Sequence, residues 1–116
     1  MYDRPVAYDE ELAARIRGLV GGGPDVTEKK IFGGLAFLIG GNMAVAASSQ
    51  GGLLVRVDPQ DSDDLVETTP AYLMEMRGKT MRGWLRVDSA DVSSDGDLAA
   101  WVERGAAHAR SLPAKG

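Results

Sequence analysis

Glycine-rich breaks divide residues 26–57 into short apolar stretches, and this punctuation constrains the fold more than any other feature of the sequence. The stretches Thr27–Phe32, Leu35–Ile39, Met43–Ser48 and Leu53–Val57 have the composition of β-strands. The breaks at 33–34, 40–42 and 49–52 have the length and the residues of tight turns. We therefore predict an antiparallel meander, whose first two stretches are either two strands or one long strand bent at a glycine bulge.

Helical patterns flank and interrupt this meander. A helix over residues 9–20 is predicted to begin at the N-cap Asp9 and to bury one stripe, formed by Leu12, Ile16, Leu19 and Val20. The pair Asp58-Pro59 predicts the start of a short acidic helix over residues 59–67. A last helix is predicted to begin at the N-cap Asp95, to end at Pro113 and to bury one stripe, formed by Leu98, Trp101, Val102, Gly105, Ala109 and Leu112.

Two more strands are expected between the second and the last helix, at Tyr72–Met76 and Gly83–Val87. The basic residues 77–82 between them are expected to form a loop. Together these elements predict an α+β fold of two layers, in which helices cover one face of an antiparallel sheet of about five strands. No linker divides the chain, so we expect one domain over residues 1–116.

The net charge of −4 is distributed unevenly along the chain. Residues 58–75 carry six acids and no base, whereas residues 76–87 carry Arg77, Lys79, Arg82 and Arg86 and no acid. Residues 29–57 are also basic and contain no acid. The positive segments are therefore the predicted strands and their loops, and the negative segments are mostly the helices. The overall acidity argues against extensive coating of nucleic acid.

Residue types that carry common chemistries are scarce. The absence of cysteine and the presence of one histidine, His108, exclude a structural zinc site, and His108 is interpreted as a packing residue at a helix border. The acids from Asp58 to Asp64 lack the spacing of a calcium loop and are typical of a helix start. No nucleotide-binding glycine motif occurs. We therefore expect no cofactor, no metal and no enzymatic activity.

The sequence also lacks a signal-peptide pattern and an apolar run of the roughly 20 residues that a membrane helix needs. We expect no membrane association and, by default, a cytoplasmic location.

Alternation along two strands predicts the candidate site. If the helices cover the face that carries Leu85 and Val87, then Leu54, Arg56, Trp84 and Arg86 project from the opposite face, with Lys79 and Arg82 in the adjoining loop. Tryptophan and arginine are enriched at binding hot spots. Three interpretations stay open for this surface: docking of a partner, a homodimer interface, or cover by another part of the chain. Met74, Met76 and Met81 could form an adaptable binding patch, but the alternation of Met74 and Met76 is interpreted more simply as one buried strand face.

Several short motifs carry a resemblance to a known family. The stretch from Lys30 to Leu38 with its Phe-Gly-Gly element, the strand Leu53–Asp58 and the stretch Met81–Val87 resemble the TfoX N-terminal domain, named for the TfoX/Sxy regulators of bacterial competence. The resemblance runs from about Leu12 to Lys115. It implies the order helix, three strands, helix, two strands, helix. It also implies a regulatory role, since the competence regulators act with the cyclic-AMP receptor protein at promoters. Those regulators carry a second, C-terminal domain, which we do not expect in a chain that ends near Leu112.

We therefore expect a bacterial regulatory or adaptor domain that acts by protein–protein contact. A transcription factor is a candidate partner, a homodimer is an alternative assembly, and nucleic acid would be contacted only indirectly. Direct nucleic-acid binding through the basic segments is a competing hypothesis. A small-ligand-binding or enzymatic domain is a third hypothesis, for which the sequence supplies no glycine-rich cofactor loop.

Overall fold

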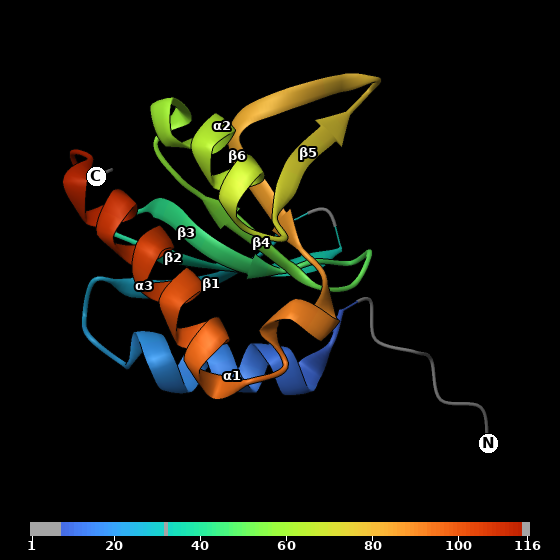
Figure 1. Ribbon diagram of the computed structural model, residues 1–116. Coiled ribbons are helices and arrows are strands. Elements are labelled where there is room, and N and C mark those ends of the chain that lie inside the picture. Colours follow the sequence, from blue (N-terminus) through green and yellow to red (C-terminus); the bar gives the residue numbers. More distant parts are fainter. Residues whose placement is uncertain (1–7, 32, 115–116) are drawn as a thin grey trace.

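The computed structural model describes residues 8–31 and 33–114, which form one sheet with helices against it (Figure 1). In chain order the elements are α1 (Glu10–Val20), β1 (Val26–Ile31), β2 (Gly34–Ile39), β3 (Asn42–Ala47), β4 (Leu53–Arg56), α2 (Pro59–Thr68), β5 (Tyr72–Met76), β6 (Lys79–Val87), the short 3-10 helix η1 (Ser89–Val92) and α3 (Asp95–Ser111).

The sheet has six antiparallel strands in the order β1-β2-β3-β4-β6-β5, one more than the sequence predicted. The extra strand arises because β1 and β2 pair with each other over their full length, with Ile31 opposite Gly34. They are therefore two strands of a hairpin and not one bent strand. The predicted strand end at Phe32 lies outside the described residues. After β4 the chain forms α2 and then the edge strand β5. The next strand, β6, returns between them and pairs with both β4 and β5.

Two of the three predicted helix caps are confirmed. The Asp9 carboxylate accepts from the backbone N–H groups of Glu11 and Leu12, and the Asp58 carboxylate accepts from that of Gln60, with Pro59 in the first turn of α2. The predicted cap Asp95 is wrong by one residue. Ser94 caps α3 through its hydroxyl, which lies 3.1 Å from the Asp97 nitrogen, and Asp95 begins the helix as an acidic residue near its positive end.

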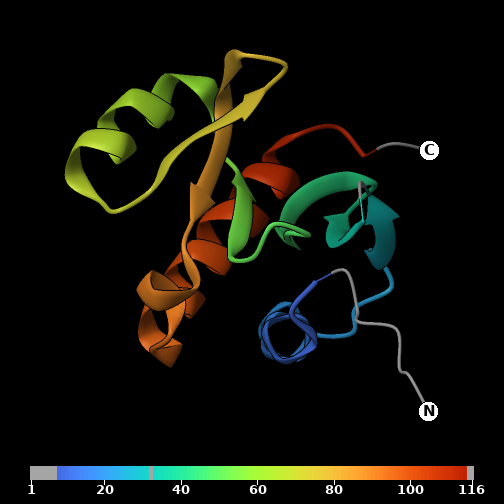
Figure 2. The same cartoon turned by 90° about the vertical axis from the view of Figure 1, so that its right-hand side faces the viewer.

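The predicted basic loop over residues 77–82 is wrong, because β6 begins at Lys79. Only Arg77 and Gly78 connect β5 to β6, and both have positive φ, at 54° and 80°. Two consecutive residues in this conformation are typical of the type I′ turn that matches the twist of a tight hairpin. The β5–β6 hairpin that this turn closes projects beyond the rest of the sheet, beside α2 (Figures 1 and 2).

The core lies between one face of the sheet and the three helices. Its fully buried side chains include Leu53, Val55, Leu85 and Val87 from the central strands, packed with residues of α1, α2 and α3. Leu19 does not belong to the buried stripe predicted for the first helix, because 45% of its surface is exposed. None of the described helices has the length and apolar character needed to cross a membrane.

Candidate interaction surface on the open face of the sheet

One face of the central strands carries no covering helix among the described residues. The core face carries Leu53, Val55, Leu85 and Val87, each at most 1% exposed. The residues between them on β4 and β6 are only half-buried and line cavities on the other face, away from the helices: Leu54, Arg56, Trp84 and Arg86. Within residues 8–31 and 33–114, α1, α2 and α3 all contribute to the core side of the sheet.

This open face is hollowed. Two adjoining cavities of about 510 and 340 Å³ occupy it. Both are lined by a shared set of apolar side chains, which are Ile31, Met43, Leu54, Met74 and Met76. Because these residues come from β1, β3, β4 and β5, the sheet curls enough for its two edge strands to line the same hollow. We call the two cavities together the open-face groove.

Four of the predicted site residues form two cross-strand pairs in this groove. Leu54 lies opposite Arg86, and Arg56 lies opposite Trp84. The Arg56 guanidinium is 4.5 Å from the centroid of the Trp84 ring, within the range of a cation–π contact. Arg86 instead reaches the turn before β4, donating to the Gln50 side-chain carbonyl at 2.9 Å and to the Gly51 backbone carbonyl at 3.2 Å.

Arg56 has an unsatisfied donor. Its Nε atom is buried and has no hydrogen-bond partner among the described residues. An arginine can donate five hydrogen bonds, and a buried donor without an acceptor raises the free energy of the folded chain. The groove therefore contains a positive group, stacked on an aromatic ring, that has no described acceptor for at least one of its donors.

The other two predicted site residues have different positions. Lys79 is exposed at the start of β6, two residues before Met81 and hence on the same side of the strand. Arg82 lies away from the groove, because its guanidinium donates to the Pro59 carbonyl at 3.2 Å and lies 3.6 Å from the Asp63 carboxylate. The predicted inclusion of Arg82 in this surface is therefore corrected: it ties β6 to α2.

Sequence reasoning missed most of the groove wall. The interpretation of Met74 and Met76 as a buried strand face is half right, since they share a face, but that face is the open one and both remain half-buried. Among the described residues that line the larger cavity, the sequence prediction had omitted Lys29, Ile31, Leu38, Gly41, Asn42, Met43, Met81 and Leu112. The methionine alternation was the one signal that pointed to this wall.

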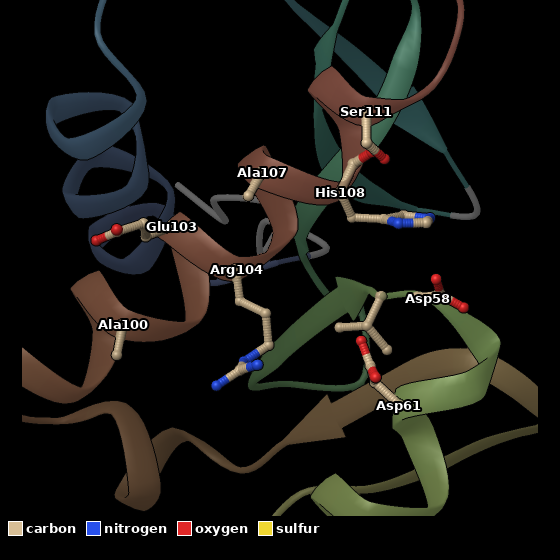
Figure 3. A pocket seen from close by; sticks show the side chains of 9 residues that line it. Asp58, Asp61, Ala100, Glu103, Arg104, Ala107, His108 and Ser111 are labelled. Atoms are coloured by element: carbon tan, nitrogen blue, oxygen red, sulfur yellow. The ribbon is translucent and has the colours of Figure 1, made fainter.

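A second hollow, of about 600 Å³, lies between α2 and α3 (Figure 3). Arg104 and His108 extend into it from α3, Asp58 and Asp61 face them from the start of α2, and Glu103 points away. His108 is half-buried, and its Nε2 atom is buried without a described partner.

Three polar side chains of this second hollow already have partners within the fold. The Asp58 carboxylate caps α2, and Arg104 lies 5.7 Å from the Trp101 ring. The Ser111 hydroxyl donates to the His108 backbone carbonyl at 2.6 Å, so it is not paired with the imidazole as a nucleophile would be. Among the described residues, no three carboxylate or imidazole groups gather as metal ligands would. We therefore take the open-face groove as the candidate functional site.

Comparison with known proteins agrees with the fold and with the motifs. No curated protein matches the chain. The protein-family model that describes the TfoX N-terminal domain matches residues 19–109, which include all six strands, α2 and most of α3. The chain therefore belongs to the TfoX N-terminal domain family.

Proposed function

We propose that this protein is a regulatory or adaptor domain that acts by binding a protein partner through the open-face groove. The observation that carries the proposal is the sheet face that no described helix covers, where Arg56 is stacked on Trp84 beside half-buried methionines. Surfaces that combine a tryptophan, an arginine and flexible apolar side chains are typical of binding hot spots. Family membership adds a regulatory context, since the family is named for regulators of bacterial competence, and this favours a partner that takes part in transcription.

The test compares proteins captured from an extract of the native host by the wild type and by Trp84→Ala. The matched control is Leu19→Ala, which removes an exposed apolar side chain from α1 on the helix side. We expect the wild type and the control to recover the same partner, and Trp84→Ala to lose it. With the purified partner, truncation of an anchoring tryptophan should cost about 2 kcal/mol or more of binding free energy.

Two outcomes would contradict the proposal. One is an unchanged set of captured proteins with Trp84→Ala, provided that circular dichroism shows the variant folded. The other is recovery of the protein alone, which analytical ultracentrifugation would distinguish as a homodimer or a monomer. A dimer that Trp84→Ala dissociates would assign the groove to self-association.

Direct binding of nucleic acid is the second candidate, because the groove is basic and contains Trp84 as a surface on which a base could stack. Two features rank it below protein binding. Trp84 is the single aromatic residue among the described side chains that line the groove, and Arg86 is already bonded to the turn before β4. Gel shifts over a salt series test it. Binding tighter than about micromolar at physiological salt, with a steep loss as salt rises, would reverse the ranking.

A further inference from the structure

The charges of the open-face groove have one predominant sign. Its lining includes Lys29, Arg56, Arg77 and Arg86, against one acid, Glu75, at the edge strand. None of these four bases lies in an ion pair with a described residue. The groove thus concentrates uncompensated positive charge in a chain whose net charge is −4.

The position of Arg56 makes one of these charges specific. Its guanidinium lies 4.5 Å from the centroid of the Trp84 ring, Arg56 lines the larger cavity, and no described carboxylate is paired with it. A carboxylate is the partner that suits a guanidinium best, because two parallel charge-assisted hydrogen bonds can form. A neutral apolar ligand would displace water from the guanidinium without supplying an acceptor, which opposes binding.

The floor around Arg56 selects for apolar groups beside that carboxylate. Ile31, Leu38 and Leu54 are half-buried there, and four methionines supply flexible side chains that can adapt to different shapes. The cavities of about 510 and 340 Å³ have the size of sites that hold a few side chains.

We propose that the open-face groove binds a segment of a partner protein that is acidic and partly apolar, and that one carboxylate of this segment binds Arg56. This inference rests on the proposed function and adds the chemistry of the partner. A second copy of the chain that presented the same face would place like charges opposite one another, which opposes a symmetric dimer through the groove.

The methionines provide a direct probe. The chain has five, and four of them, Met43, Met74, Met76 and Met81, line the groove. We would label the methionine methyl groups with ¹³C and titrate the full chain with short acetylated, amidated peptides. One peptide combines aspartate with leucine and phenylalanine, and its matched control has asparagine in place of every aspartate.

We expect the acidic peptide to shift these four methyl resonances saturably and to bind about tenfold or more tightly than the asparagine peptide, since a hydrogen bond between charged groups is worth about one factor of ten or more. Arg56→Gln should weaken the acidic peptide by a similar factor and leave the asparagine peptide unchanged. Arg110→Gln, an exposed arginine of α3 that lines no described cavity, is the control and should change neither titration. If Arg56→Gln does not fold, Lys29→Gln replaces it, with its neighbour Lys30→Gln as control, because only Lys29 lines the groove.

Each alternative outcome overturns the inference. Equal affinity for both peptides would show that charge does not matter, and an absence of shifts would show that the groove does not accept such a segment. Shifts that depend on protein concentration without peptide would assign the groove to a second copy, and tighter binding of single-stranded DNA would assign it to nucleic acid. The proposed function fails separately, if Trp84→Ala captures the same proteins as the wild type.

Discussion

Arg56 and Trp84 occupy directly opposite positions on β4 and β6, and the arginine guanidinium lies 4.5 Å from the centroid of the indole ring. The contact holds the arginine along the floor of the open-face groove, with Nε buried and without a described acceptor. A buried donor that lacks an acceptor destabilises the unbound chain. This cost to the fold is consistent with the binding role proposed above for the groove.

This relationship predicts that Arg56→Met leaves the domain as stable as the wild type or slightly more stable. Methionine keeps an apolar stem against Trp84 and removes the donor that has no described acceptor, so little stability should be lost. We expect the free energy of unfolding in urea to fall by no more than about 0.5 kcal/mol, and it could rise by as much as about 1 kcal/mol.

Arg86→Met is the matched comparison for that measurement. It loses the two hydrogen bonds that tie β6 to Gln50 and Gly51, so it should lower the free energy of unfolding by about 1 kcal/mol. A larger loss for Arg56→Met than for Arg86→Met would make Arg56 a structural residue and would remove the main support for the binding role.

The sequence predicted the position of Leu54, Arg56, Trp84 and Arg86 on one face because side chains alternate along a strand with a period of two. Arg82 was instead predicted to lie in the adjoining loop, and the structure places it on β6. Gly83 has a φ of 88° and interrupts the alternation, so Met81 and Trp84 share the open face while Arg82 turns to α2.

The remainder of the groove depends on features that no local pattern contains. Lys29 and Met43 come from β1 and β3, and they approach β5 only because the whole sheet curls. Strand register and sheet curvature arise from packing between distant segments. The caps of α1 and α2 depend only on neighbouring residues, so they could be predicted from the sequence.

Ser62 is predicted to stabilise the junction between α2 and the sheet. Its hydroxyl is fully buried, donates to the Pro59 carbonyl at 2.7 Å and accepts from the Gly83 N–H at 3.0 Å. Ser62→Ala leaves that buried N–H without a partner, so we expect a loss of about 1–3 kcal/mol in the free energy of unfolding. Ser93→Ala, at an exposed hydroxyl that bonds within its own turn, should change it by less than about 0.5 kcal/mol. Equal effects would refute this role.

Gly105 is predicted to be required for the close approach of α3 to the sheet. A Cβ atom at this position would lie within 3 Å of the Ala44 carbonyl and of the Val45 side chain. Gly105→Ala should therefore lower the free energy of unfolding by about 1–3 kcal/mol, although alanine is the better helix former.

The control is Gly96→Ala in the first turn of the same helix, where a Cβ meets no atom within 4 Å and where stability should rise by up to about 1 kcal/mol. Stabilisation by both substitutions would show that α3 can shift away from β3 at little cost.

The ion pair between Arg17 and Glu28 is predicted to make stability depend on pH. It links the last turn of α1 to β1 through two hydrogen bonds, of which the one from Arg17 Nη2 to Glu28 Oε1 is 2.9 Å long. Hydrogen bonding from Arg17 lowers the pKa of Glu28 below its ordinary value of 4.5, so the pair contributes its full stability above that pH and loses it as pH falls through the lower pKa of the folded state. The melting temperature of the wild type should exceed that of Glu28→Gln at neutral pH, and the difference should shrink in acid. It should also shrink in high salt, because both side chains are partly exposed to solvent.

Glu103→Gln, whose carboxylate forms no ion pair with a described residue, serves as the control and should follow the wild type across the pH range. A difference between wild type and Glu28→Gln that stays constant down to strongly acidic pH would mean that the glutamate acts by packing and not by its charge.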